Sequence, residues 1–146
     1  MANKFHIDKV IANVQRTKRE LPIILAKQAQ SEFVKNFTNE GFDGSKWITP
    51  NRRIAGTDEY KYPKTKGLSR RTKPTLTMSG VLRRATANSI REARWDKIML
   101  VIDLPYAARH NDGLDGMPER KYVGQTKSLT LLQIETINNY FNQVWH

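Results

Sequence analysis

Histidine and acidic side chains are the groups in this chain that could support acid–base or metal chemistry. His110, directly followed by Asn111 and Asp112, has the residue type of a general base or a metal ligand. A catalytic pair or a metal site needs further groups that converge in space. The sequence contains no His-x-x-His motif, no Glu-x-x-His motif and no acidic cluster. We therefore expect a structural role for His110, with a small hydrolase or nuclease that uses His110 and Asp112 as the enzymatic alternative.

Other catalytic and metal-binding motifs are missing from the sequence. The chain has no cysteine, which excludes disulfides, thiolate nucleophiles and Cys-based zinc sites. Asp112, Asp115 and Glu119 share a turn-rich stretch, but their spacing is not that of an EF-hand. Residues 41–46 contain Gly and Lys without the spacing of a phosphate-binding loop. The sequence thus predicts no catalytic residue, no metal ligand and no cofactor.

Positive charge is the strongest signal in the composition. The net charge is +11, and between Lys46 and Arg94 thirteen Lys and Arg residues face three acids, a local balance of +10. Such a segment can neutralise phosphates or meet acidic partners, and the interleaved Trp47, Tyr60 and Tyr62 could stack on unpaired bases. The predicted DNA or partner contacts are Arg52, Arg53, Lys64, Lys66, Arg70, Arg71, Lys73, Arg83 and Arg84. A stand-alone nucleic-acid-binding module is the alternative function.

Apolar residues at helical spacing predict helices over residues 8–39. We expect Asp8 to cap the first helix and Pro22 to interrupt the segment, so that one helix ends near Leu21 and a second runs over 22–39. Gly41 is the expected C-terminal stop. From there the helical periodicity vanishes, and residues 42–75 are predicted to form a long basic loop punctuated by Gly and Pro.

Residues 76–124 are predicted to form an α+β core. The expected elements are a short helix over 79–85, two strands over 89–93 and 98–102 joined by a hairpin turn, a short helix over 105–111 and a short strand over 122–123. Residues 127–145 follow as a C-terminal helix whose apolar face is broad enough for part of it to meet a neighbouring subunit.

The predicted fold class is therefore α+β, with a small antiparallel sheet flanked by N-terminal and C-terminal helices. Residues 1–146 have a length typical of one domain. No segment approaches the ~20 apolar residues that span a bilayer, so we expect no membrane contact.

Four short motifs resemble, in the same order, elements of the phage virion morphogenesis family, the tail-completion proteins of Mu-like and P2-like phages. They are Phe42–Trp47, Leu76–Leu82, Tyr106–Gly113 and Met117–Gly124. The motif residues carried over are Trp47, Gly80, Leu82, Tyr106, Ala107, His110, Gly113, Pro118, Arg120 and Tyr122. The family often has Pro-Phe after the Arg, where this chain has Lys121-Tyr122 and so keeps the aromatic residue.

The resemblance implies a non-enzymatic structural protein that acts at tail completion or at the head–tail junction. It implies a ring-forming subunit, assembled in the host cytoplasm and located in the virion. The implied partners are other tail or neck proteins and further copies of the chain, with possible contact to packaged DNA. In this interpretation Arg120 pairs with a carboxylate or with carbonyls, and Tyr122 fills a gap in the core.

Overall fold

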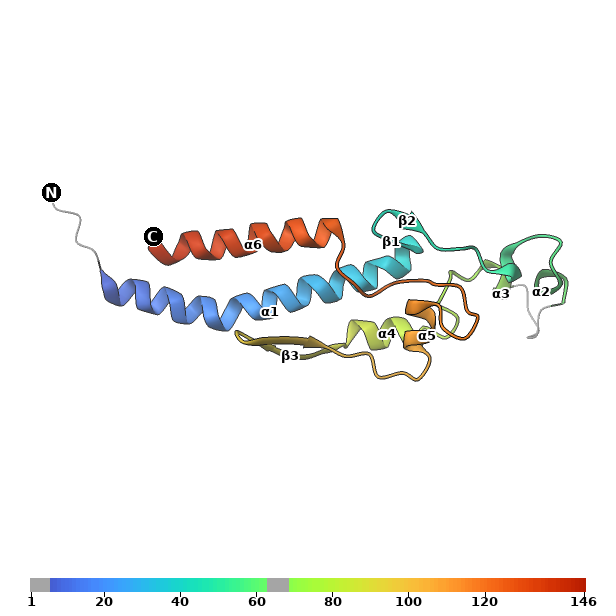
Figure 1. Cartoon of the computed structure of the whole chain (residues 1–146), viewed down its shortest axis with the longest axis horizontal. Helices are drawn as coiled ribbons and strands as arrows, with labels where there is room; N and C mark the ends of the chain where they lie inside the picture. The colour runs from blue at the N-terminus through green and yellow to red at the C-terminus, as the bar shows by residue number, and fades with distance from the viewer. Residues whose placement is uncertain (1–5, 63–68) are drawn as a thin grey trace.

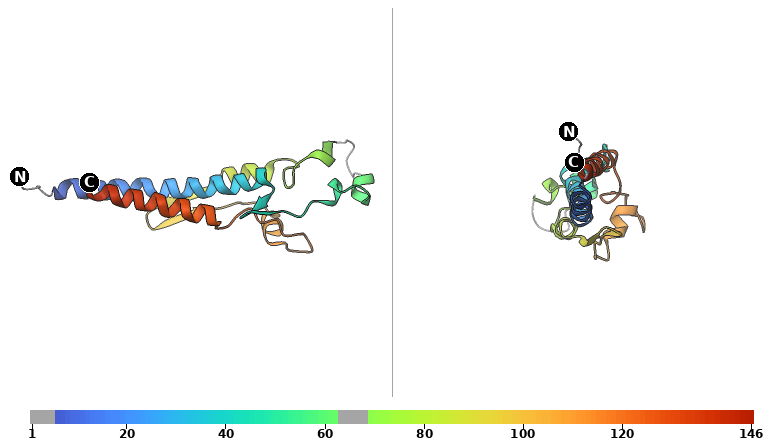
Figure 2. Two further views of the ribbon diagram at one scale, coloured as in Figure 1. Left: turned by 90° about the horizontal axis from the view of Figure 1, so that it is seen from above. Right: turned by 90° about the vertical axis from the view of Figure 1, so that its left-hand side faces the viewer.

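A computed structural model describes residues 6–62 and 69–146 of the chain. The molecule is elongated, and its elements lie along one long N-terminal helix, α1 (Ile7–Asn39), as Figures 1 and 2 show. The C-terminal helix α6 (Lys127–Trp145) runs beside α1 on one side. A β-hairpin and two short helices lie on the other side.

Helix α1 is continuous, so the predicted interruption near Leu21 is wrong. A proline inside a helix removes one backbone hydrogen bond and costs about 3 kcal/mol. Here Leu21, Pro22 and Ala26 are all buried. Burial of these apolar side chains offsets the cost of the missing bond, and the helix passes through the proline.

Both ends of α1 differ from the expected capping. The helix begins after His6, and Asp8 lies in its first turn, where an acid still favours the helix dipole. At the other end Glu40, not Gly41, adopts the left-handed conformation that ends the helix. Gly41 is needed for a different reason, since a Cβ there would lie 2.5 Å from the Ser45 carbonyl oxygen across the hairpin.

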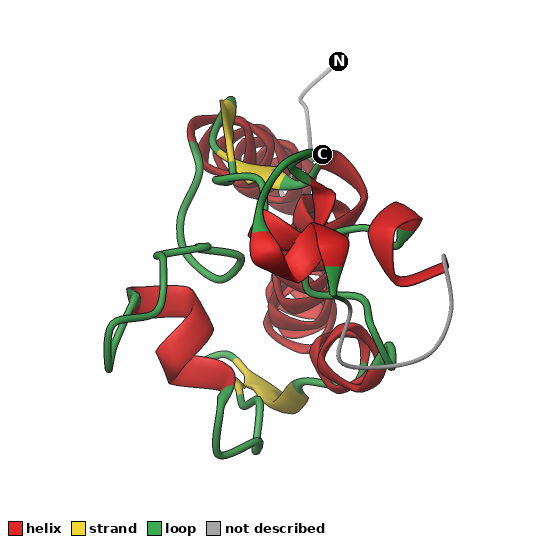
Figure 3. Cartoon of the chain, turned by 90° about the vertical axis from the view of Figure 1, so that its right-hand side faces the viewer, coloured by secondary structure: helices red, strands yellow, loops and turns green. Residues whose placement is uncertain are grey.

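The predicted structureless loop contains several short elements. Strands β1 (Gly41–Phe42) and β2 (Ser45–Lys46) form a tight antiparallel hairpin. They are followed by η1 (Asn51–Arg53), α2 (Asp58–Lys61) and α3 (Ser69–Thr72). We call residues 48–62 and 69–77 the distal lobe. It occupies one end of the molecule, and Figure 3 looks onto that end.

The predicted core elements are largely confirmed. Helix α4 (Val81–Ala87) precedes β3 (Ile90–Arg94) and β4 (Lys97–Leu100), which pair antiparallel, and α5 (Ala107–Asp112) follows. The predicted strand at 122–123 is wrong. The backbone N–H groups of Tyr122 and Val123 donate to the Asn111 side chain, so they have no strand partner.

The fold class is α+β, as the sequence predicted, with two small antiparallel sheets of two strands each. The core consists of two small clusters. Phe37, Leu82, Ala107 and Tyr122 form one, and Ala29, Phe33 and Leu129 form the other. Within residues 6–62 and 69–146, no helix is both long and apolar enough to cross a membrane.

Candidate functional site

The motif residues meet around the irregular segment Arg120–Val123. The side-chain oxygen of Asn111 accepts hydrogen bonds from the backbone N–H groups of Tyr122 and Val123, both at 3.0 Å. The His110 carbonyl accepts the Arg120 backbone N–H at 2.8 Å. Helix α5 therefore supplies the hydrogen bonds that a neighbouring strand would otherwise give this segment. We call this meeting point inside the chain the junction, a name that does not refer to the head–tail junction of a virion.

Aromatic rings fill the junction. The Tyr122 side chain is fully buried, and its ring lies 5.0 Å from that of Phe37. The Trp47 ring meets Phe37 edge-on at 5.9 Å, while its indole N–H donates to the Lys121 carbonyl at 2.8 Å. The buried Asn36 amide donates to the Tyr122 carbonyl at 3.0 Å. The junction thus joins α1, the segment after β2, α5 and the chain leading to α6.

The Tyr122 hydroxyl is held as a hydrogen-bond donor. It donates to the Ala107 carbonyl at 3.2 Å. Burial, together with the nearby Asp112 and Tyr106, raises the pKa of Tyr122 to about 12. The phenol therefore stays protonated at any physiological pH and serves as a fixed contact to α5.

Arg120 is a buried cation whose hydrogen bonds go to the backbone. Its Nε and Nη2 atoms both donate to the Ile48 carbonyl at 3.3 Å, which ties the junction to the start of the distal lobe. Burial lowers the pKa of its guanidinium. The resemblance implied that Arg120 pairs with a carboxylate or with carbonyls, and in the structure its partner is a carbonyl.

Two motif glycines have positive φ angles, a backbone conformation that glycine adopts without steric strain. Gly113 ends α5 with a φ of 67°, and a Cβ there would lie 2.9 Å from the Glu119 backbone nitrogen. Gly80 precedes α4 with a φ of 71°. Leu82, the second residue of α4, enters the core cluster of Phe37. Pro118 is exposed and lines an open cleft of about 520 Å³ below η1.

His110 has the surroundings of a structural histidine. Its ring lies 6.0 Å from that of Tyr106, and its Nδ1 atom is enclosed without a hydrogen-bond partner. Burial and the positive charges of Arg120 and Arg109 lower its pKa, so the imidazole is held neutral. Asp112 accepts from the Asn111 amide at 2.7 Å. Within the described residues, His110 and Asp112 share no hydrogen bond.

The described part of the chain offers no cluster of three or more His, Cys, Asp or Glu side chains that could hold a metal ion. In the junction the buried side chains of Asn36, Arg120 and Tyr122 all donate to backbone carbonyls, whereas the Nδ1 atom of His110 has no partner among the described residues. This arrangement can position chain segments and can hold surfaces in a fixed relation.

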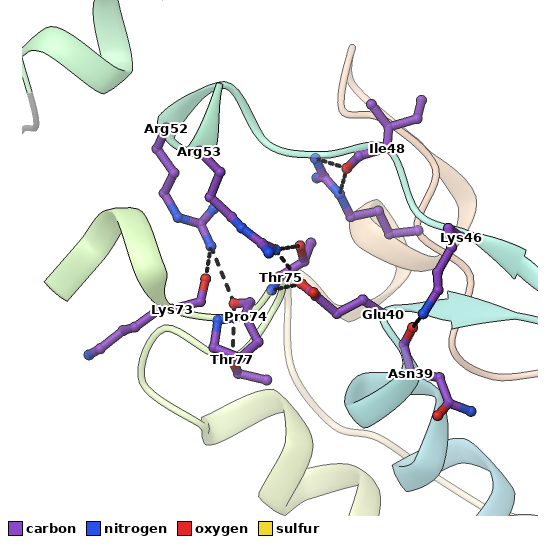
Figure 4. Close-up of polar contacts among 11 residues, drawn as sticks. Asn39, Glu40, Lys46, Ile48, Arg52, Arg53, Lys73, Pro74, Thr75 and Thr77 are labelled. Atoms are coloured by element: carbon purple, nitrogen blue, oxygen red, sulfur yellow. Dashed lines mark hydrogen bonds and ion pairs between the residues drawn. The ribbon is translucent and has the colours of Figure 1, made fainter. Parts of the chain in front are cut away.

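Three of the predicted DNA or partner contacts also form contacts within the chain, at the distal lobe (Figure 4). Arg52 donates through Nη2 to the carbonyls of Lys73 and Pro74, at 3.2 and 3.3 Å. Arg53 forms an ion pair of 2.6 Å with Glu40, whose carboxylate also accepts the Thr75 backbone N–H.

The Lys73 ammonium donates to the Met78 carbonyl at 3.1 Å. Like the two arginines, it makes its contact within the chain. We call Arg52, Arg53, Lys73, Glu40 and Thr75 the lobe fastening.

The other predicted contacts lie apart from the lobe fastening. The Arg71 guanidinium stacks 4.3 Å above the Tyr60 ring, and Arg83 donates to the Thr38 hydroxyl at 3.5 Å. Arg84 is exposed on α4. Lys64, Lys66 and the side chain of Arg70 lie outside the described residues.

Sequence reasoning missed the polar residues that organise both regions. Asn36 lies between Phe33 and Phe37 on the buried face of α1, where a polar residue at core spacing is itself a signal. Asn111 lies inside the motif Tyr106–Gly113, but no role of its own was predicted for it. Glu40 was not singled out, although it and Asp43 are the two acids just before the strongly basic stretch that begins at Lys46.

Comparison of the chain with protein-family models, with curated proteins and with solved structures found no match.

Proposed function

We propose that this chain is a structural subunit of a tailed bacteriophage virion, acting at tail completion or at the head–tail junction as part of a ring. One observation carries the proposal. The four motifs on which the family resemblance rests come from separate parts of the chain, yet each contributes a residue to the same core cluster around Tyr122, through Trp47, Leu82, Ala107 and Tyr122 itself. Motif residues that pack together in this way hold separate chain segments in a fixed relation, which a structural subunit requires.

The surface area supports a subunit of an assembly. The chain exposes 10,110 Å², whereas a compact monomer of 16.9 kDa would expose about 7,700 Å². A standard interface covers about 800 Å² on each partner, so an elongated chain has room for the two contact faces that each subunit of a closed ring needs.

The candidate ring contacts are the distal lobe and the two terminal helices. Helix α1 exposes Ile7 and Ile11 near its N-terminus, and the distal lobe exposes Ile54 and Tyr62. These apolar side chains lie near opposite ends of an elongated molecule: the first pair precedes Thr17, the first buried residue of α1, and the second pair follows η1 and α2, respectively, which contain no buried residue. Neighbouring subunits that cover them would remove apolar surface from water.

DNA contact is a secondary element of the proposal. The lobe fastening commits Arg52, Arg53 and Lys73 to intramolecular contacts, which leaves α4 as the better candidate surface. Arg83 and Arg84 lie next to each other there and are both exposed. A ring that turned α4 toward its lumen would face packaged DNA with these side chains.

Light scattering on the purified chain tests the proposal, at low and high protein concentration, with and without duplex DNA at two salt concentrations. We expect concentration-driven assembly that is indifferent to DNA, and closed rings in electron micrographs of the concentrated sample. A chain that stays monomeric yet binds DNA tightly, with affinity that falls steeply as salt rises, would instead establish the nucleic-acid-binding module.

A pair of matched variants separates the DNA contact from the assembly. Arg83→Ala/Arg84→Ala removes two cations from α4, and Lys18→Ala/Arg19→Ala removes two exposed cations from α1. We expect only the first variant to reduce the salt dependence of DNA binding, with ring formation unchanged in both. Equal effects of the two variants would rule out α4 as a DNA-facing surface.

A further inference from the structure

Helix α6 has two stripes of side chains, and the one that faces α1 is the more polar. The inner stripe consists of Leu129, Gln133, Thr136, Tyr140 and Val144. Gln28 of α1 donates to the Thr136 hydroxyl at 2.8 Å, and the Tyr140 hydroxyl donates to Glu20 at 3.2 Å. Only Leu129 and Val144 of this stripe are buried apolar residues. The contact between the two helices thus combines these hydrogen bonds with the apolar cluster of Leu129, Ala29 and Phe33.

The outer stripe lies about a third of a turn around the helix. It consists of Leu131, Ile134, Asn138, Phe141 and Trp145. Their alternating spacing of three and four residues is that of a helix that packs along its length against another helix. Leu131 is 70% exposed and Trp145 is 66% exposed. Ile134 and Phe141 are about half exposed, and Phe141 also borders a shallow cavity that Trp95 of the β-hairpin lines.

Charge distinguishes this face from the rest of the molecule. The chain carries a net charge of +11, yet Lys127 and Glu135 are the only charged side chains of α6. Two copies of a strongly basic protein repel each other over most approaches. An approach through α6 brings together neutral, apolar surfaces, so it is the approach that suits a second copy of this chain.

The position of the distal lobe sets the orientation. The lobe, with cations such as Arg52 and Arg71, lies at the end of the molecule opposite the C-terminus of α6. A parallel pair of α6 helices would bring two basic lobes together, whereas an antiparallel pair separates them to opposite ends. We propose that α6 pairs antiparallel with α6 of a second copy through the outer stripe.

The spacing of the stripe fixes one register. With the two-fold axis level with Thr136, whose side chain faces α1, Leu131 lies level with Phe141 of the second copy, and Ile134 lies level with Asn138 of the second copy. The same register brings Lys127 level with Trp145 of the second copy, where an ammonium can pack on an indole face. It is the antiparallel register that gives every stripe position a counterpart. This pairing does not depend on the proposed ring, because a two-fold contact and ring contacts use different symmetry.

Sedimentation equilibrium of the full chain over a concentration series tests the pairing. One helix pair is at the lower end of interface sizes, ~1,200 Å², so we expect a monomer–dimer equilibrium in the micromolar range. Leu131→Lys should weaken dimerisation about tenfold or more, because it buries a charge in the stripe. Ile48→Lys adds the same charge at a distal position that is 64% exposed and should leave dimerisation unchanged. A strictly monomeric wild type, or equal weakening by both variants, overturns the proposal.

Engineered cysteines test the orientation independently, since the native chain has none. We expect an equimolar mixture of Leu131→Cys and Phe141→Cys chains to form a mixed disulfide dimer under oxidation, and each variant alone to form none. The antiparallel register brings 131 next to 141 and holds two copies of 131 about 15 Å apart along the helices. Disulfide dimers of Leu131→Cys alone would indicate parallel helices and overturn the assignment.

Discussion

The junction and the distal lobe are held together by different kinds of interaction. In the junction, buried rings of Phe37 and Tyr122 pack in contact, and their hydrogen bonds lie within an apolar surrounding. In the distal lobe, η1 and α2 contain no buried residue, and the Arg53 and Glu40 side chains of the lobe fastening are 31% and 27% exposed. Since apolar burial is worth more than surface ion pairs, the junction determines whether the chain folds and the fastening determines how the lobe is placed.

The largest expected effect is the loss of the Tyr122 ring. Tyr122→Ala should lower the free energy of unfolding by about 3–5 kcal/mol, because it removes a fully buried aromatic side chain. Urea unfolding followed by circular dichroism measures this. Tyr122→Phe, which loses only the hydroxyl contact to Ala107, should cost about 1 kcal/mol. Tyr62→Ala in the exposed part of the lobe serves as the control and should change little.

Asn111→Ala should have the second largest effect. It leaves the backbone N–H groups of Tyr122 and Val123 without their acceptor, a loss of about 2–3 kcal/mol. The matched control is Asn139→Ala, which truncates an exposed asparagine of α6. An equal response of the two variants in urea unfolding would show that the side-chain bonds of Asn111 do not hold the segment.

The lobe fastening should respond locally. Glu40→Ala removes the ion pair to Arg53 and the acceptor of the Thr75 N–H, yet we expect a global loss of only about 1 kcal/mol or less. Amide hydrogen exchange should instead speed up at residues 51–62 and 71–77 while the junction stays protected. Glu135→Ala, which removes an exposed carboxylate of α6, is the control. Faster exchange at Tyr122 as well would remove the distinction between the two regions.

Acid should affect the two regions in separate steps. Hydrogen bonds from Thr75 and the Arg53 guanidinium outweigh the effect of burial and hold the pKa of Glu40 below its ordinary 4.5, and burial holds the pKa of His110 below 6.5. In both cases the unfolded chain binds the proton at higher pH than the folded chain. Stability is therefore complete above the unfolded pKa and falls as the pH drops below it.

We expect a first small loss of stability below about pH 6.5, from the junction, and a second below about pH 4.5, from the fastening. Urea midpoints measured across this range should show both steps. His110→Gln should remove the upper step alone, and Glu40→Gln the lower step alone. A single step shared by both variants would contradict the assignment of each step to one region.

The sequence predicted the elements that depend on local patterns. The C-terminal helix over 127–145 and the hairpin that contains Trp95 were identified because periodicity and turn chemistry are local. The interruption at Pro22 was wrong because tertiary burial outweighs a single missing hydrogen bond. The strand at Tyr122 was wrong because its backbone is bonded by a side chain, Asn111, eleven residues earlier. No periodicity encodes that kind of contact.

The sequence predicted which residues belong to the candidate site better than it predicted how they are arranged. The motif residues Trp47, Ala107 and Tyr122 do meet, but the resemblance gave no indication that Asn36 would join them. The cations were found by counting charges, which cannot distinguish Arg53, paired with Glu40, from the exposed Arg84. That ion pair depends on where α1 ends, because Glu40 is the residue at its C-terminal end, and the local sequence pattern did not predict this end correctly.

Because α1 is unbroken, it acts as a strut about 50 Å long between the exposed N-terminal half and the Glu40 fastening. A force or torque applied at one end of α1 is therefore transmitted along the helix to the other end. The compliant point of the strut is Pro22, whose missing N–H leaves the Lys18 carbonyl without a helical donor. Trp95 at the hairpin tip and Phe141 of α6 line the shallow cavity beside Pro22, so the two neighbouring elements brace the strut where it would bend most easily.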